Sequence, residues 1–122
     1  MTIEVVYLTN DLMFSSRVMS LARSAGVSLK VVGSRNALCD HVANTSSVMA
    51  FIDLEHPESQ MEMLVGELAA SGNPPKIVAY GPHVKQTLLD AAQAAGADSV
   101  LSRGQFDKQV GSILQALAEQ QS

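Results

Sequence analysis

The stretch Val48-Met49-Ala50-Phe51-Ile52-Asp53 is the most apolar run of the chain, and it ends in a carboxylate. A short continuous apolar run between polar residues is typical of a strand that is buried on both faces of a parallel sheet. The acid then lies at the carboxyl end of the strand, where open α/β sheets bind ligands. The sequence therefore predicts a buried parallel strand that presents Asp53 at the functional edge of a sheet.

Four other apolar runs predict further strands, with helical spacing in the segments between them. Together with residues 48–52, the expected strands cover residues 3–8, 29–32, 77–80 and 99–101. Apolar residues three or four apart mark the helices, namely Phe14, Val18, Leu21 and Ala25; Leu38 and Val42; Leu64 and Leu68; Val84, Leu88 and Ala92; and Phe106, Val110, Ile113 and Leu117. Such β-α units predict an α/β fold, a flavodoxin-like three-layer α/β/α sandwich whose five-stranded parallel sheet has the order 2-1-3-4-5. We expect one domain over residues 1–122.

Short polar residues stand where three of these helices should begin. Asn10-Asp11 and Ser34 precede the first two helices, and Glu58-Ser59 precedes the third. Side chains of this kind accept hydrogen bonds from the free N–H groups of a first helical turn. We therefore expect N-caps at all three places.

Composition limits the classes of function. The hydrophobic content of 47% is that of a globular protein, and the net charge of −4 comes without a basic run, which excludes direct nucleic-acid binding. No apolar stretch approaches the roughly 20 residues of a membrane helix. A positively charged leader before an apolar segment is also missing, so we expect a cytoplasmic protein. The single cysteine, Cys39, is expected to be a small core residue.

Three local features resemble the receiver domains of two-component response regulators, the CheY-like superfamily. Asp53 closes the third strand with Pro57 four residues later, Ala95-Gly96-Ala97-Asp98 leads into the fifth strand, and the basic residue Arg103 ends that strand before Phe106. The resemblance implies that Asp53 accepts a phosphoryl group from a histidine kinase. It further implies a Mg²⁺ ion held by an acidic pair after the first strand, a Thr or Ser ending the fourth strand and a Lys-Pro pair ending the fifth.

The chain departs from this pattern at the metal positions. Thr9 and Asn10 stand where the acidic pair is expected, and Asp11 follows one residue later. A neutral amide in place of a carboxylate removes a charge that Mg²⁺ favours. We expect no resident cofactor, although Asp11 and Asp53 together remain the candidates for a Mg²⁺ site.

Departures continue at the other supporting positions. The Thr or Ser position falls on Tyr80 or Gly81, and Arg103 with Gly104 replaces Lys-Pro. A planar guanidinium cannot reproduce the point charge of an ammonium group in the same space. The sequence is thus identified as a degenerate receiver, with a pocket formed by Asn10, Asp11, Tyr80, Gly81 and Arg103. Asp53 is then either the phosphoacceptor, or a residual acid that caps the following turn or pairs with Arg103.

Three functional hypotheses follow. The favoured one is a non-enzymatic signalling module that binds proteins, either a histidine kinase or an output protein, without efficient phosphorylation. A homodimer is compatible with it, through residues that receiver-like domains use for pairing, here Leu89, Val100, Gln105, Gln109 and Ser112. The first alternative is an atypical receiver that a histidine kinase phosphorylates on Asp53.

The second alternative is a flavin or small-ligand domain of the flavodoxin type. The first loop, Thr9-Asn10-Asp11-Leu12, opposes it because this loop has no glycine and places a negative charge where a phosphate would bind. A metal site built from His56, His83 and Asp53 is a further option, although these residues lack a compact ligand spacing.

Overall fold

A computed structural model describes residues 3–120 of the chain as alternating strands and helices. The strands are β1 (Glu4–Leu8), β2 (Ser28–Val32), β3 (Ser47–Asp53), β4 (Lys76–Gly81) and β5 (Ser99–Ser102). The helices are α1 (Leu12–Ala25), α2 (Arg35–Asn44), α3 (Met61–Ala69), α4 (Gln86–Ala95) and α5 (Arg103–Glu119). All strand pairs are parallel and their order is β2-β1-β3-β4-β5, so the predicted sandwich and strand order are confirmed.

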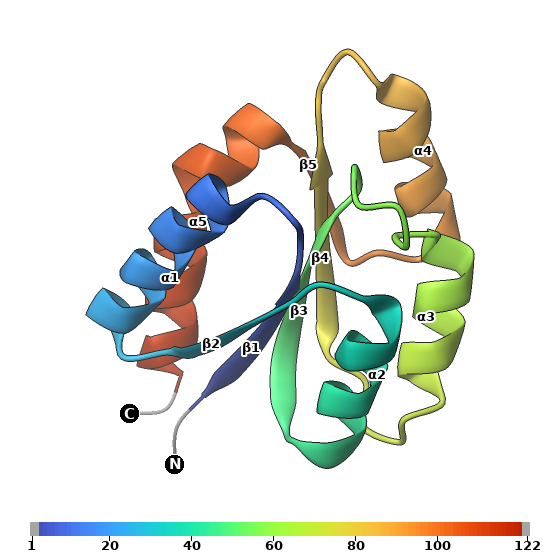
Figure 1. The fold of residues 1–122 in the computed structure, drawn as a ribbon. Helices are drawn as coiled ribbons and strands as arrows, with labels where there is room; N and C mark the ends of the chain where they lie inside the picture. Colours follow the sequence, from blue (N-terminus) through green and yellow to red (C-terminus); the bar gives the residue numbers. More distant parts are fainter. Residues whose placement is uncertain (1–2, 121–122) are drawn as a thin grey trace.

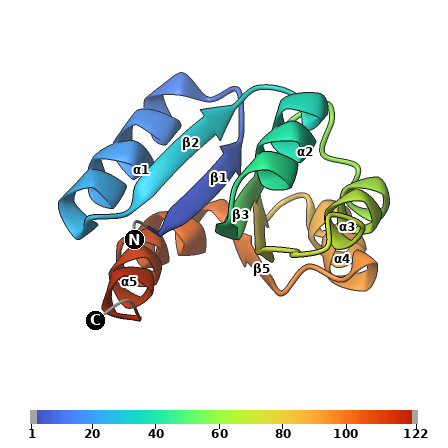
Figure 2. The same ribbon diagram turned by 90° about the horizontal axis from the view of Figure 1, so that it is seen from below.

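Helices cover both faces of the sheet. Figures 1 and 2 show α1 and α5 on one face and α2, α3 and α4 on the other. Because successive side chains of a strand point to opposite faces, each strand supplies both layers. Ile52, for example, packs under α2, α3 and α4, whereas its neighbour Phe51 packs under α1 and α5.

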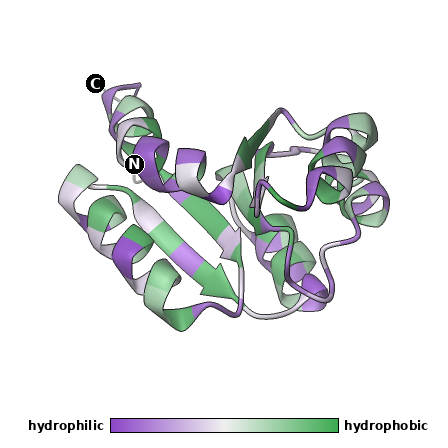
Figure 3. Cartoon of the chain, turned by 90° about the horizontal axis from the view of Figure 1, so that it is seen from above, coloured by the Kyte–Doolittle hydropathy of each residue, from purple (hydrophilic) through white to green (hydrophobic). Residues whose placement is uncertain are grey.

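The two cores differ in composition. The core beneath α2, α3 and α4 is aliphatic, whereas the core beneath α1 and α5 holds every aromatic residue of the chain, namely Tyr7, Phe14, Phe51, Tyr80 and Phe106. Their rings meet edge to face, except for the stacked pair Tyr80 and Phe106, whose centroids lie 4.3 Å apart. In the edge strand β2 the exposed polar residues Ser28 and Lys30 alternate with Leu29 and Val31 (Figure 3), and the strand ends in the buried Val32.

Two of the three expected N-caps are confirmed. The side chain of Asp11 accepts from the N–H of Phe14, and that of Ser34 accepts from the N–H of Ala37. The expectation for Glu58-Ser59 is wrong, because α3 begins later, after Gln60, without a side-chain cap. The Glu58 carboxylate instead accepts from the backbone N–H of Arg35, 2.9 Å away, and so connects the β3–α3 loop to the start of α2.

The helix phase expected around α4 is also wrong. Val84 lies in the β4–α4 loop and is exposed, and Leu89 rather than Leu88 is buried against the sheet. The helix begins only at Gln86, and its buried residues are Leu89 and Ala92. Since Leu89 is buried, it cannot contribute to a pairing surface as expected.

Cys39 lies outside the core, contrary to expectation. It is half-buried where α2 approaches α3, and its thiol donates to a carboxylate oxygen of Glu67 at 2.9 Å. Burial, together with that carboxylate, raises the pKa of the Cys39 thiol from 9.0 to about 12. None of the helices within residues 3–120 is long and apolar enough to cross a membrane.

Candidate functional site at the carboxyl edge of the sheet

Asp53 ends β3 in the centre of the sheet, and only 6% of its surface is exposed. Each carboxylate oxygen has a hydrogen-bond donor. Oδ1 accepts from the N–H of Glu55 at 3.0 Å, and Oδ2 accepts from the hydroxyl of Thr9 at 2.7 Å. The expectation that Asp53 caps the following turn is therefore confirmed, and the carboxylate is compensated by neutral donors within the fold.

Thr9 is a hydrogen-bond partner of Asp53 that the sequence alone did not indicate. It follows β1, is almost fully buried, and its hydroxyl oxygen also accepts from the N–H of Asp11 at 3.0 Å. Strands β1 and β3 are neighbours, and Leu8 lies opposite Ile52, so the next residues, Thr9 and Asp53, meet. The strand order 2-1-3-4-5 was itself a prediction, so this contact could have been inferred once the register was fixed.

The carboxylate of Asp11 is bound to α1 and to Arg103. Its Oδ1 accepts from the first turn of α1, and its Oδ2 accepts from the Arg103 guanidinium at 2.6 Å. Two hydrogen bonds lower the pKa of the Asp11 carboxyl below its usual value, mainly the one from the Phe14 N–H and then the one from the Arg103 guanidinium. The hydrogen bond between Asp11 and Arg103 also raises the pKa of Arg103. The expected ion pair between Arg103 and Asp53 is thus wrong, because the helix cap orients Asp11 as the partner.

Neither Tyr80 nor Gly81 provides the small hydroxyl of a Thr or Ser at the carboxyl edge of the sheet. Tyr80 lies beside Asp53 in the sheet register, and its hydroxyl is hydrogen-bonded to that of Tyr7 at 2.5 Å inside the aromatic core. Burial is the main cause that raises the pKa of Tyr7 to about 12 and that of Tyr80 well above its usual value. Gly81 faces the other core, where an added Cβ would lie 3.4 Å from Leu54.

The residues present do not fit a Mg²⁺ site at Asp53. Asn10 is directed towards β2, since a Cβ at Gly33 would lie 3.5 Å from the Asn10 amide oxygen, whereas Asp53 is on the opposite neighbour of β1. Asp11 is committed to α1 and Arg103, and both oxygens of Asp53 have donors. Residues 3–120 contain no group of three or more His, Cys, Asp or Glu side chains that could share a metal ion.

The two loop histidines have different roles, neither of which matches the expected metal site. His56 is buried, its Nδ1 accepts from the N–H of Glu58 at 2.9 Å, and its Nε2 is 2.8 Å from the carbonyl oxygen of Gly33. A neutral ring with its proton on Nε2 satisfies both contacts, so His56 fixes the β3–α3 loop to the end of β2. His83 is exposed on the β4–α4 loop.

Comparison with known proteins adds evidence on the fold. No protein-family model matches the sequence, and no curated protein matches it. Among solved structures, the receiver domain of the TMAO respiratory system response regulator TorR aligns with a TM-score of 0.81 at 16% identity, over 97% of this chain and 98% of that one. The chemotaxis response regulator CheY4 of Vibrio cholerae aligns with a TM-score of 0.78 at 12% identity, over 96% and 99%. The chain has the receiver fold.

A third similar structure carries the metal that the site of this chain does not fit. It is the receiver domain of a sensor histidine kinase from Pseudomonas aeruginosa, which has a magnesium ion coordinated in its active-site cleft and aligns with a TM-score of 0.79 at 16% identity, over 98% and 99%. Identities this low show the fold alone. What this receiver fold can do must therefore be argued from its own residues.

Proposed function

We propose that this receiver-fold chain is a non-enzymatic signalling module that acts by binding other proteins and does not accept phosphoryl groups efficiently on Asp53. One observation carries the proposal. The carboxylate of Asp53 is buried, and its two oxygens accept hydrogen bonds from the Thr9 hydroxyl and the Glu55 N–H, while Asp11, the acid that follows β1, is paired with Arg103. A module that keeps the fold but lacks this chemistry retains its surfaces for recognition.

The chemistry of phosphoryl transfer supports the proposal. Phosphoryl transfer depends on positioning and on positive charge that neutralises the transferring group, chiefly from metal ions and a lysine. At Asp53 the metal-binding acids are replaced, and the cation Arg103 is directed towards Asp11. Removing one preorganised electrostatic group typically costs about a hundredfold or more in rate. Losing two should reduce phosphorylation of Asp53 far below that of a working receiver.

The proposed partners are proteins of two-component signalling. In a solved complex, the receiver domain of Saccharomyces cerevisiae Ssk1, which has a similar fold, is bound to the histidine phosphotransfer protein Ypd1. For this chain, a kinase, a phosphotransfer protein or an output protein is the partner class that we propose. A homodimer through α4, β5 and α5 also belongs to the proposal, with Gln105, Gln109 and Ser112 exposed for it and Val100 half-buried.

The test is chemical activation followed by NMR. The protein is incubated with Mg²⁺ and either acetyl phosphate or beryllofluoride, and the amide chemical shifts are mapped onto the sequence. We expect the shifts around Asp53, Thr9 and Glu55 to be the same as in Asp53→Ala. Large shifts in the native chain that vanish in Asp53→Ala but persist in Asp40→Ala, an exposed acid on α2, would refute the proposal.

A further inference from the structure

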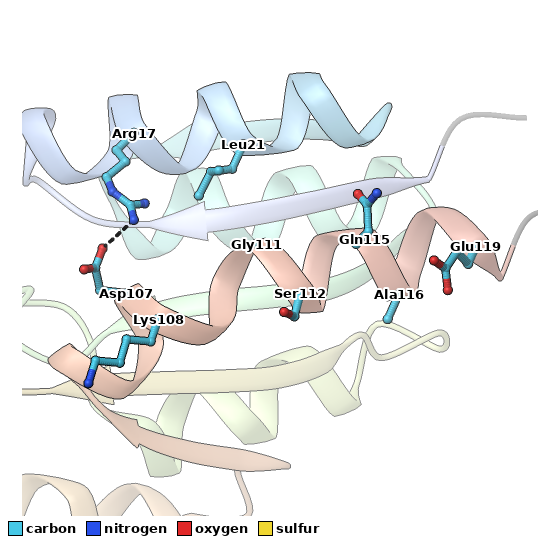
Figure 4. A pocket seen from close by; sticks show the side chains of 9 residues that line it. All are labelled: Arg17, Leu21, Asp107, Lys108, Gly111, Ser112, Gln115, Ala116 and Glu119. Atoms are coloured by element: carbon cyan, nitrogen blue, oxygen red, sulfur yellow. Dashed lines mark ion pairs between the residues drawn. The ribbon is translucent and has the colours of Figure 1, made fainter.

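The outer side of α5 and the adjacent side of α1 form a groove of about 600 Å³. Figure 4 shows α5 along one side of this groove and Arg17 and Leu21 of α1 along the other. An ion pair between Arg17 and Asp107, at 3.3 Å, joins the two helices near one end. The other residues that α5 contributes are Lys108, Gly111, Ser112, Gln115, Ala116 and Glu119.

The α5 side of the groove is small in the middle and charged at its ends. Gly111, Ser112 and Ala116 leave the helix backbone open to a close neighbour, and a Cβ added at Gly111 would meet no atom within 4 Å. Lys108 and Glu119 lie at the two ends (Figure 4), about three helical turns apart and therefore on the same side of α5. Among the ion pairs within residues 3–120, none includes Lys108 or Glu119.

The chemistry of this lining is complementary to a second copy of α5. An antiparallel second helix, related to the first by a twofold axis at the middle of the groove, places each lining residue opposite another one. The contacts match a cation with an anion, a small residue with a small residue, and a hydroxyl with an amide that can hydrogen-bond to it. They are Lys108 with the partner's Glu119, Gly111 with the partner's Ala116, and Ser112 with the partner's Gln115. Each contact occurs twice, as in the self-complementary interface of a twofold dimer.

The balance of charge in the groove also favours a second copy. Arg17 and Lys108 are positive and Asp107 and Glu119 are negative, so the lining is neutral although the chain as a whole has a net charge of −4. A lining of one sign would repel its own copy, because like charges would meet across the axis. We propose that a second copy of this chain docks along this groove through its own α5, antiparallel to the first, and forms a twofold dimer.

This dimer is separate from the chemistry of Asp53 and from the pairing through α4, β5 and α5 that belongs to the proposed function. Gln105 and Gln109 are exposed for that pairing, but neither lines the groove, and Gln105 lines a hollow next to α4 instead. Either dimer can therefore fail in an experiment without the other. Because the interface uses mainly one helix from each copy, it has the small size of weak, transient contacts.

Sedimentation equilibrium and NMR dilution of the native chain, from about 1 µM to 1 mM, test the proposal. We expect a monomer–dimer equilibrium in which the amide shifts of Gly111, Ser112 and Gln115 follow the dimer fraction. A monomer at every concentration would overturn the proposal. Concentration-dependent shifts confined to Gln105 and Gln109 would overturn it too, because they would place the contact on the other side of α5.

Charge-reversal variants test the antiparallel arrangement. Lys108→Glu gives two pairs of like charges in the dimer, as does Glu119→Lys, so each should weaken the dimer at least about tenfold. An equimolar mixture of the two variants should dimerise again, because both contacts between the different chains then join opposite charges. Lys76→Glu and Glu62→Lys make the same changes at exposed positions outside the groove and should have no effect. Groove variants that dimerise like the native chain, or a mixture that stays monomeric, would contradict the arrangement.

A glycine variant tests the close approach of the two helices. Gly111→Leu should fold, because a Cβ there meets no atom within 4 Å and Leu favours helix more than Gly does, but its side chain would fill the groove. We expect the dimer to weaken at least about tenfold. Gly66→Leu on α3, where a Cβ also meets no atom within 4 Å, is the matched control and should leave dimerisation unchanged. If Gly111→Leu keeps the native circular dichroism spectrum and dimerises as the native chain does, the groove is not the interface.

Discussion

The hydrogen bond between Thr9 and Asp53 makes a sharp prediction about stability. Replacing Thr9 with Val keeps the shape of the side chain but removes the donor to Asp53 Oδ2 and the acceptor for the Asp11 N–H. A hydrogen bond to a charged group contributes about 1.5 to 3 kcal/mol, and one between neutral groups about 1 kcal/mol. Because Thr9 and Asp53 are both buried, we expect the free energy of unfolding to fall by about 2 to 4 kcal/mol.

Urea denaturation followed by circular dichroism measures this loss. The midpoint should fall while the slope with urea stays the same, since the surface exposed on unfolding is unchanged. Thr9→Ser, which keeps the hydroxyl, should retain most of the stability. Thr87→Val, on the exposed side of α4, should change the stability by less than about 0.5 kcal/mol.

A double-mutant cycle with Asp53→Asn isolates the contribution of the charge. The loss caused by Thr9→Val should be smaller by about 1 kcal/mol or more in the Asp53→Asn background, because the hydroxyl then faces a neutral amide. The reasoning fails if Thr9→Val is no more destabilising than Thr87→Val. It also fails if the effects of Thr9→Val and Asp53→Asn are additive.

Three further predictions concern the titratable groups. Asp11→Asn keeps an N-cap but removes the charge paired with Arg103, so it should cost up to about 1 kcal/mol near neutral pH. The pKa of Asp11 is lowered in the folded state, so the stability difference between the native chain and Asp11→Asn is present above pH 3.8, the ordinary pKa of the group. In urea titrations this difference should vanish as the pH falls below 3.8. Alkylation of Cys39 near pH 8 should be about a thousandfold slower in the native chain than in urea, since its pKa is raised to about 12; equal rates would contradict the raised pKa of this half-buried thiol. Tyr7 and Tyr80 have raised pKa values, so their contribution to stability is present below pH 10.0 and is lost as the pH rises; ultraviolet absorbance should show tyrosinate only together with alkaline unfolding.

The fold could be predicted because its signals are local. The run that ends in Asp53 is apolar throughout, as a strand covered on both faces must be, and the short polar residues Asp11 and Ser34 begin helices by accepting backbone N–H groups. The phase of α4 was predicted wrongly because the β4–α4 loop is longer than the pattern indicates. Val84 extends an apparent helical stripe but lies before the first helical residue.

The site was predicted only in part because its contacts join residues far apart in sequence. Thr9 and Asp53 meet through the register of β1 against β3, and Arg103 finds Asp11 rather than Asp53 because the cap geometry of α1 orients that carboxylate. Neither effect is visible in composition or spacing. The residues that depart from the receiver pattern could be identified from the sequence, whereas the partners of Asp53 depend on the strand register and on side-chain orientations that the sequence does not give.

Calorimetric titration with Mg²⁺ is the most direct test of the claim that Asp53 has lost its metal-binding neighbours. The native chain should give no saturable heat and should match Asp53→Ala in the titration. Saturable binding of Mg²⁺ to the native chain at millimolar concentration or below, abolished by Asp53→Ala and unaffected by Asp40→Ala, would contradict the account.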